Sequence, residues 1–168
     1  KKDSLAGPSA EDRTYIGSAQ PIFTYGILNT ITYKRFELNF FLRGVYGNDV
    51  LNSTRMTYAT TLRLPGSNVL TEALTNGLKD DTQYCSYYIE KGSFLRLDNA
   101  SLSYDFNADN FLGIEKIRIN CTVQNLFVIT KYKGVDPEVD MSGIDPGVQD
   151  ATYYPKSRTF LFGINLKF

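Results

Sequence analysis

The sequence contains no histidine and no tryptophan among its 168 residues. Without histidine, the chain lacks the usual base of a catalytic triad and the commonest zinc ligand, so the composition disfavours an enzyme. Its 18 basic residues balance 18 acidic residues. A chain of zero net charge lacks the basic surface that nucleic-acid binding requires, so we expect no nucleic-acid partner. We also expect no cofactor.

Cysteines and long apolar runs are also scarce. Cys85 lies in a polar segment and Cys121 in an alternating apolar one, far apart and without a C-x-x-C motif, so we expect no disulfide. The uncharged stretch 14–33 is interrupted by glycine, proline and amides, which excludes a membrane-spanning helix. No signal peptide opens the chain, and we interpret it as a piece of a longer protein.

The most informative segment that is present is the last eleven residues, 158–168. Every second residue is apolar: Phe160, Phe162, Ile164, Leu166 and Phe168. Because side chains of a strand alternate between its faces, one face of this segment is fully apolar. Such a face promotes aggregation in a soluble protein, whereas a strand of about 9–11 residues with an apolar outer face is typical of an outer-membrane barrel.

The same alternation predicts four further strands, at residues 23–33, 36–46, 93–106 and 114–128. Lys34-Arg35 predicts a tight reversal between the first two. The apolar phase flips near Asp98-Asn99, which indicates a β-bulge.

The predicted connections alternate between short and long. Short turns are expected at 34–35 and 107–113, and long loops at 47–92 and 129–157, with helical stretches near 54–62 and 71–78. Tight periplasmic turns and long external loops are typical of outer-membrane barrels. Two alternatives remain open on the pattern alone. One is a soluble carbohydrate-binding or adhesin β-sandwich; the other is a carboxylate hydrolase that uses Asp80 and Asp81.

Six segments together resemble, in order, the C-terminal end of the SusC/RagA family of TonB-dependent outer-membrane transporters. They are D-R-T-Y-I-G-S-A-Q-P-I-F-T-Y-G (12–26), Y-K-R-F-E-L (33–38), F-L-R-G-V-Y-G-N-D-V-L-N (41–52), E-K-G-S-F-L-R-L-D-N (90–99), N-L-F-V-I-T-K-Y-K-G-V-D-P-E (125–138) and Y-P-K-S-R-T-F-L-F-G-I-N-L-K-F (154–168). The family often has a tryptophan before E-x-G-S-F, and this chain has none.

The resemblance implies an all-β fold: about five C-terminal strands of an antiparallel transmembrane barrel of roughly 22 strands, with long external loops. It places residues 1–168 in the barrel, and the plug and the TonB-contacting segment outside this chain. The implied function is TonB-dependent import of a glycan, oligosaccharide or peptide across the outer membrane of a Gram-negative bacterium. The implied partners are a SusD-like surface lipoprotein, TonB, the barrel-assembly machinery and outer-membrane lipid.

Within such a barrel, polar residues that alternate with the apolar set face the lumen. They could pack against the plug or line a substrate path. The lumen-facing candidates are Glu37, Asn39, Arg43, Arg118, Asn120 and Gln124, in line with Lys116, Thr122, Asn165 and Lys167.

The long loops carry the remaining candidates. Tyr84, Tyr87 and Tyr88 resemble a sugar-stacking set, although packing of the loop against the barrel rim or a partner explains them equally well. Asp136, Glu138, Asp140 and Asp145 form an acidic cluster without the spacing of a calcium loop, which favours a solvated loop over a metal site. Asp136-Pro137-Glu138 is part of the resemblance to the family, and we expect it to shape the loop. In the last strand, Gly163, Leu166 and Phe168 resemble the signal read by the barrel-assembly machinery, although Leu161 stands where that pattern has a polar residue. Phe168 is also explained as an aromatic residue of the interfacial girdle, and the two roles are compatible.

Overall fold

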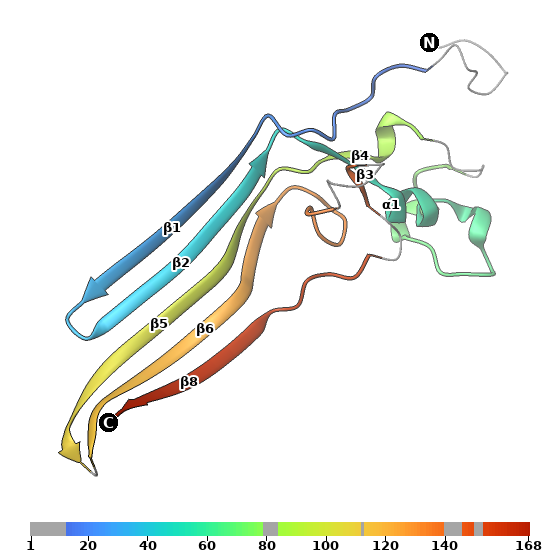
Figure 1. Cartoon of the computed structure of the whole chain (residues 1–168). Helices are drawn as coiled ribbons and strands as arrows, with labels where there is room; N and C mark the ends of the chain where they lie inside the picture. The colour runs from blue at the N-terminus through green and yellow to red at the C-terminus, as the bar shows by residue number, and fades with distance from the viewer. Residues whose placement is uncertain (1–12, 79–83, 112, 140–145, 150–152) are drawn as a thin grey trace, which may run out of the picture.

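The computed structural model describes residues 13–78, 84–111, 113–139, 146–149 and 153–168. Five antiparallel strands form one curved sheet in the order β1-β2-β5-β6-β8 (Figure 1). They are β1 (Phe23–Tyr33), β2 (Phe36–Tyr46), β5 (Phe94–Phe111), β6 (Ile114–Thr130) and β8 (Thr159–Lys167). The prediction of an all-β fold with five antiparallel strands is therefore confirmed. Among the described residues, no helix is both long and apolar enough to cross a membrane.

The two short connections differ in how well they were predicted. Residues Tyr33 and Phe36 pair directly, so Lys34-Arg35 forms the expected tight reversal, with Lys34 in the left-handed region at φ 54°. The predicted turn at 107–113 is wrong, because β5 continues to Phe111 and pairs with β6 down to Ile114. Gly113, at φ 77°, lies beside that reversal, and glycine adopts this conformation without steric cost. The mainly polar residues 107–110 before Gly113 therefore belong to β5 and lengthen the β5–β6 hairpin.

The register gives the sheet two chemically distinct faces, because directly paired residues share a face. Asn120 pairs with Gly163 and Ser103, and Ser103 pairs with Glu37; the next row on the opposite face pairs Cys121 with Phe162 and Leu102. We call these the polar face and the apolar face. The apolar face includes Ile27, Ile31, Leu38, Phe40, Leu42, Leu97, Leu102, Ile117, Ile119, Val123, Phe160, Phe162, Ile164 and Leu166.

A β-bulge at Asp98 keeps both faces consistent along β5. Phe41 pairs with Asn99 and Leu42 with Leu97, so Asp98 is the extra residue opposite β2. The pairing with β6 shifts at the same place. The predicted bulge is thus confirmed, and without it the apolar residues of one half of β5 would lie on the wrong face.

The two long connections fold together at one end of the sheet (Figure 1). They form a second sheet in the order β4-β3-β7, from β3 (Asp49–Asn52), β4 (Ile89–Lys91) and β7 (Val148–Gln149), in which β7 pairs parallel with β3. Beside it lie α1 (Ser53–Tyr58) and the short 3₁₀ turns η2 (Thr61–Arg63), η3 (Thr71–Leu74) and η4 (Ser86–Tyr88). We call this assembly the loop module; the helical stretches predicted in the first long loop fall within it.

The buried apolar residues lie in the loop module and at its junction with the large sheet. Val50, Tyr132 and Val139 form one cluster, and a second is built around Leu51, Ala59 and Tyr88. By contrast, Phe162 on the apolar face is 80% exposed. Among the described residues no second layer covers this face, so they do not form the two packed sheets of a β-sandwich.

Candidate functional site

The six residues expected to share one side of the sheet do so. Glu37, Asn39 and Arg43 lie on the polar face through β2, and Arg118, Asn120 and Gln124 lie on it through β6. Alternation at period 2 is sufficient to place them, because each strand has one apolar and one polar face. What the alternation does not reveal is which of them interact.

At the end nearest the loop module, charged residues of the polar face meet residues of the second long connection. We call this group the outer cluster: Arg43, Arg96, Asp98, Asp136, Glu138 and Lys156. The guanidinium of Arg43 donates two hydrogen bonds to the Glu138 carboxylate, at 2.8 and 2.7 Å, and a third to Asp98 at 3.2 Å. A planar guanidinium matches a carboxylate in this two-bond arrangement, which fixes orientation as well as charge.

Arg96 is the central residue of the outer cluster and is only 1% exposed. Its Nη2 donates to Asp136 Oδ1 at 2.6 Å, its Nη1 donates to Asn125 Oδ1, and its Nε lies 3.5 Å from Glu138 Oε2. A buried arginine is strongly destabilising when its partner is removed, because the remaining charge is uncompensated. Sequence reasoning missed Arg96, which shares a face with Ser101 and Ser103 only when the bulge at Asp98 is counted.

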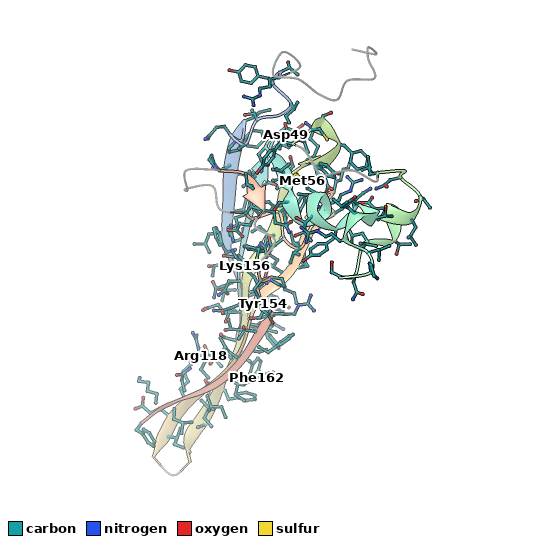
Figure 2. The ribbon with its side chains drawn as sticks, turned by 90° about the vertical axis from the view of Figure 1, so that its right-hand side faces the viewer. Asp49, Met56, Arg118, Tyr154, Lys156 and Phe162 are labelled. Carbon is teal, nitrogen blue, oxygen red and sulfur yellow. The ribbon has the colours of Figure 1, made fainter. Side chains whose placement is uncertain are left out.

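The outer cluster carries no net charge, since its three cations face three carboxylates. Burial of Glu138 raises its pKa, but hydrogen bonds from Arg43 and Lys156 outweigh this effect, so the pKa lies below its ordinary value. Glu138 is therefore ionised at neutral pH. Lys156 contributes through a 2.6 Å contact with Glu138 Oε2 and lies beside the exposed Tyr154 in Figure 2.

A second group of charges lies at the far end of the polar face, and we call it the inner cluster. Arg118 donates from Nε and Nη2 to the two oxygens of Asp105, at 2.6 and 2.9 Å. Lys116 contacts Asp105 at 2.8 Å, and Glu37 lies 3.7 Å from Arg118. Figure 2 shows Arg118 in the half of the sheet that lies away from the loop module, near the level of Phe162. These charges also compensate one another.

Between the two clusters the polar face is mainly uncharged. Hydroxyl and amide groups bond across neighbouring strands in pairs: Thr30 to Asn39 at 2.5 Å, Ser101 with Thr122 at 2.8 Å, and Asn165 to Asn120 at 3.4 Å. The face therefore offers polar groups along its length without a strong field of one sign.

The three tyrosines of the first long connection do not form a common surface. Tyr88 is 3% exposed and belongs to a core of the loop module, which corrects the expectation that it is available for stacking. Its ring meets Tyr87 edge-on at 5.1 Å. Tyr84 and Tyr87 are exposed at 75% and 43%. Tyr88 therefore packs within the loop module itself, and of the three tyrosines only Tyr84 and Tyr87 are accessible.

Arg55 holds this part of the loop module together. Its Nε and Nη2 donate to Glu72 at 2.7 and 3.0 Å, and Nη1 donates to the Tyr87 carbonyl at 3.0 Å. Its guanidinium also stacks over the Tyr87 ring at 4.4 Å. The hydrogen bonds that Arg55 donates to Glu72 raise the pKa of Arg55 further above its ordinary value. No local signal in the sequence links these residues.

The two described residues of the predicted acidic cluster are counter-ions of arginines on the sheet. Asp136 and Glu138 belong to the outer cluster and are not free in a solvated loop, which corrects that interpretation. Asp80, Asp81, Asp140 and Asp145 lie outside the described residues. Within the described ranges, no group of three or more His, Cys, Asp or Glu residues is arranged to hold a metal. Cys85 and Cys121 are free thiols.

The residues at the end of the chain lie on both faces. Gly163 pairs with Asn120 on the polar face, where an added Cβ would lie 2.6 Å from Asn120 Oδ1. Leu166 pairs with Ile117 on the apolar face, and Phe168 follows β8 and is 75% exposed.

Comparison with known proteins gives a consistent set of relatives. No family model matches the chain. It is 38% identical over 154 residues to the TonB-dependent receptor SusC of Bacteroides thetaiotaomicron, an alignment that covers 85% of this chain and 15% of that receptor. It is 32% identical over 178 residues to the TonB-dependent receptor P3 of Formosa agariphila, which covers 95% and 18% respectively.

Solved structures agree with these relatives. The RagAB peptide importer in its open-open state superposes with a TM-score of 0.74 at 27% identity, over 99% of this chain and 19% of that chain. Its closed-closed state gives a TM-score of 0.72 at 25% identity. The chain therefore spans less than a fifth of the length of the proteins it matches.

Proposed function

The chain belongs to the SusC/RagA family of TonB-dependent transporters, and we propose that it forms the last five strands of an outer-membrane barrel that imports nutrients. Barrels of this class have roughly 22 strands and a plugged lumen. The plug and the segment that contacts TonB would come from other parts of the same protein. Import consists of gated passage and requires no bond chemistry.

The observation that carries this proposal is the uncovered apolar face. Strands of about 9–11 residues cross an outer membrane when tilted, and β1 and β2 contain 11 residues each and β8 contains 9. The apolar face would meet lipid, and the polar face would line the lumen. Aromatic residues at the strand ends, such as Phe36 against Tyr104 at 4.5 Å, fit the girdle at a membrane interface.

The orientation that we propose rests on the lengths of the connections. Short turns of outer-membrane barrels lie on the periplasmic side and long loops lie outside, so the loop module would lie at the cell surface. The outer cluster would then line the external mouth of the lumen and the inner cluster its periplasmic end. The hydroxyl and amide groups between them would contact the plug or line the path of the transported molecule.

The relatives and the exposed surface support the partners and the substrate class that we propose. A SusD-like lipoprotein would cap the loop module and deliver an oligosaccharide or peptide, with energy supplied through TonB. Tyr84 and Tyr87 offer exposed rings for such recognition. The barrel-assembly machinery would read Gly163, Leu166 and Phe168 on the last strand.

The first test is to fractionate the native cells and probe for this segment. We expect a detergent-soluble outer-membrane protein far heavier than 19.0 kDa. A deletion strain should lose growth on one class of oligosaccharide or peptide, and the complete gene should restore it. A soluble protein of 19.0 kDa would exclude the barrel and favour a binding module.

A further inference from the structure

Part of the second long connection lies against the polar face instead of extending away from the sheet. We call residues 131–139 the strap. Its carboxylates, Asp136 and Glu138, reach Arg96 of β5 and Arg43 of β2. If the polar face lines the lumen, as proposed above, the strap occupies part of the barrel mouth.

The two arginines explain why the strap is held there. Arg43 and Arg96 are directly opposite each other in the register of β2 and β5. Like charges in directly opposite positions destabilise a strand pair unless counter-charges are present. Asp98 supplies one negative charge from the sheet, and Asp136 and Glu138 supply two more from the strap. The strap therefore supplies two of the carboxylates that compensate the positive charges of Arg43 and Arg96 on the sheet.

Both ends of the strap are also anchored in the loop module. Tyr132 and Val139 pack with Val50 in one buried cluster. The backbone N–H of Lys133 donates to Glu90 Oε2 at 2.8 Å. The strap is thus attached to the loop module at each end and to the sheet at its centre, an arrangement that opposes independent movement.

We infer that the strap is a fixed narrowing of the external mouth of the barrel, and that Arg96 is its positioning residue. Arg96 is almost fully buried between sheet and strap, so it acts through Asp136 and does not meet the transported molecule. On the sheet side, Asn125 accepts from Arg96 and donates to the carbonyls of Lys156 and Ser157. The same arginine thus aligns the strap with the segment that leads into β8.

The inference is tested with a spin label on the strap in the complete transporter. Val135 is 47% exposed and takes no part in the ionic contacts, so Val135→Cys provides the site after Cys85 and Cys121 are replaced. We expect an immobilised label in the parent protein. Arg96→Met should increase its mobility several-fold. Arg118→Met is the matched control, because it breaks a similar ion pair on the same face but far from the strap.

A second variant separates loss of the strap contact from loss of the fold. Asp136→Asn weakens the same contact from the strap side and leaves every strand residue intact, so it should also mobilise the label. Heat-modifiability of the barrel reports the fold of each variant. A label that is mobile in the parent protein, or equally immobile after Arg96→Met and Asp136→Asn, would overturn the inference. Import is measured separately: an immobilised strap in a protein that imports nothing would reject only the proposed function.

Discussion

A single arginine placed at adjacent positions of β8 should have opposite consequences, depending on the face it enters. Phe162 lies on the apolar face opposite Cys121, and Leu161 lies on the polar face opposite Thr122. If the apolar face meets lipid, Phe162→Arg places a charge in hydrocarbon. Leu161→Arg places the same charge at the lumen, among hydroxyl and amide groups.

The free-energy cost of Phe162→Arg depends on how deep residue 162 lies in the bilayer. Phe162 pairs through Cys121 with Leu102, in a row that lies between the aromatic strand ends, and it is 80% exposed in this chain. An arginine on the lipid face of a barrel costs about 2–4 kcal/mol near the bilayer midplane and less toward the interfaces. Since about 1.4 kcal/mol corresponds to a factor of ten, Phe162→Arg should shift the unfolding equilibrium roughly thirtyfold to several hundredfold.

The assay is denaturant unfolding of the complete barrel in lipid vesicles, with the folded fraction read from heat-modifiable migration. We expect Phe162→Arg to lower the free energy of unfolding by about 2–4 kcal/mol and Leu161→Arg to change it far less. Equal costs, or a larger cost for Leu161→Arg, would refute the assignment of the two faces.

Three further predictions concern the loops and the sheet. The pKa of Glu138 lies below its ordinary value of 4.5, so the ionised side chain stabilises the strap contact fully above pH 4.5, and this stabilisation is lost as the pH falls through the lowered pKa. The mobility of the label on the strap should therefore rise only in acid, and Glu138→Gln should remove this pH dependence. Tyr88→Ala should destabilise the loop module by on the order of 3 kcal/mol, visible as protease cleavage of the loops while the barrel stays folded. Gly44→Ala should cost about 1–3 kcal/mol of barrel stability, because its Cβ would lie 2.7 Å from the carbonyl oxygen of Phe94; Gly66→Ala, with ordinary contacts, should not.

The features predicted from sequence are those that a local pattern determines. Alternation at period 2 assigns each side chain of β8 to a face, and a change in its phase locates the bulge at Asp98. The turn predicted at 107–113 is wrong because it also rests on a local pattern, the composition of the segment. Polar residues before Gly113 have the composition of a turn, but β5 extends to Phe111, and after an irregularity that follows Asn107 the pairing resumes between Phe111 and Ile114.

The outer cluster and the loop module could not be predicted in this way. Arg43 and Glu138 are 95 residues apart, and β7 contains only Val148 and Gln149, paired in parallel with a strand of the other loop. Such contacts depend on where the sheet places the two loops, and no local pattern records that. Composition alone therefore predicts a solvated acidic loop, whereas in the structure Asp136 and Glu138 neutralise two arginines that are directly opposite each other in β2 and β5.

The most direct test of the central claim is a spin-label scan of positions 159–167 of β8 in the complete protein in lipid, comparing collision with oxygen, which enriches in the bilayer, against a water-soluble nickel chelate. The account predicts a strict alternation. Labels at 160, 162, 164 and 166 should collide with oxygen, and labels at 159, 161, 163, 165 and 167 should not. Nickel accessibility on both faces, or oxygen accessibility without alternation, would contradict a barrel wall with its apolar face in lipid.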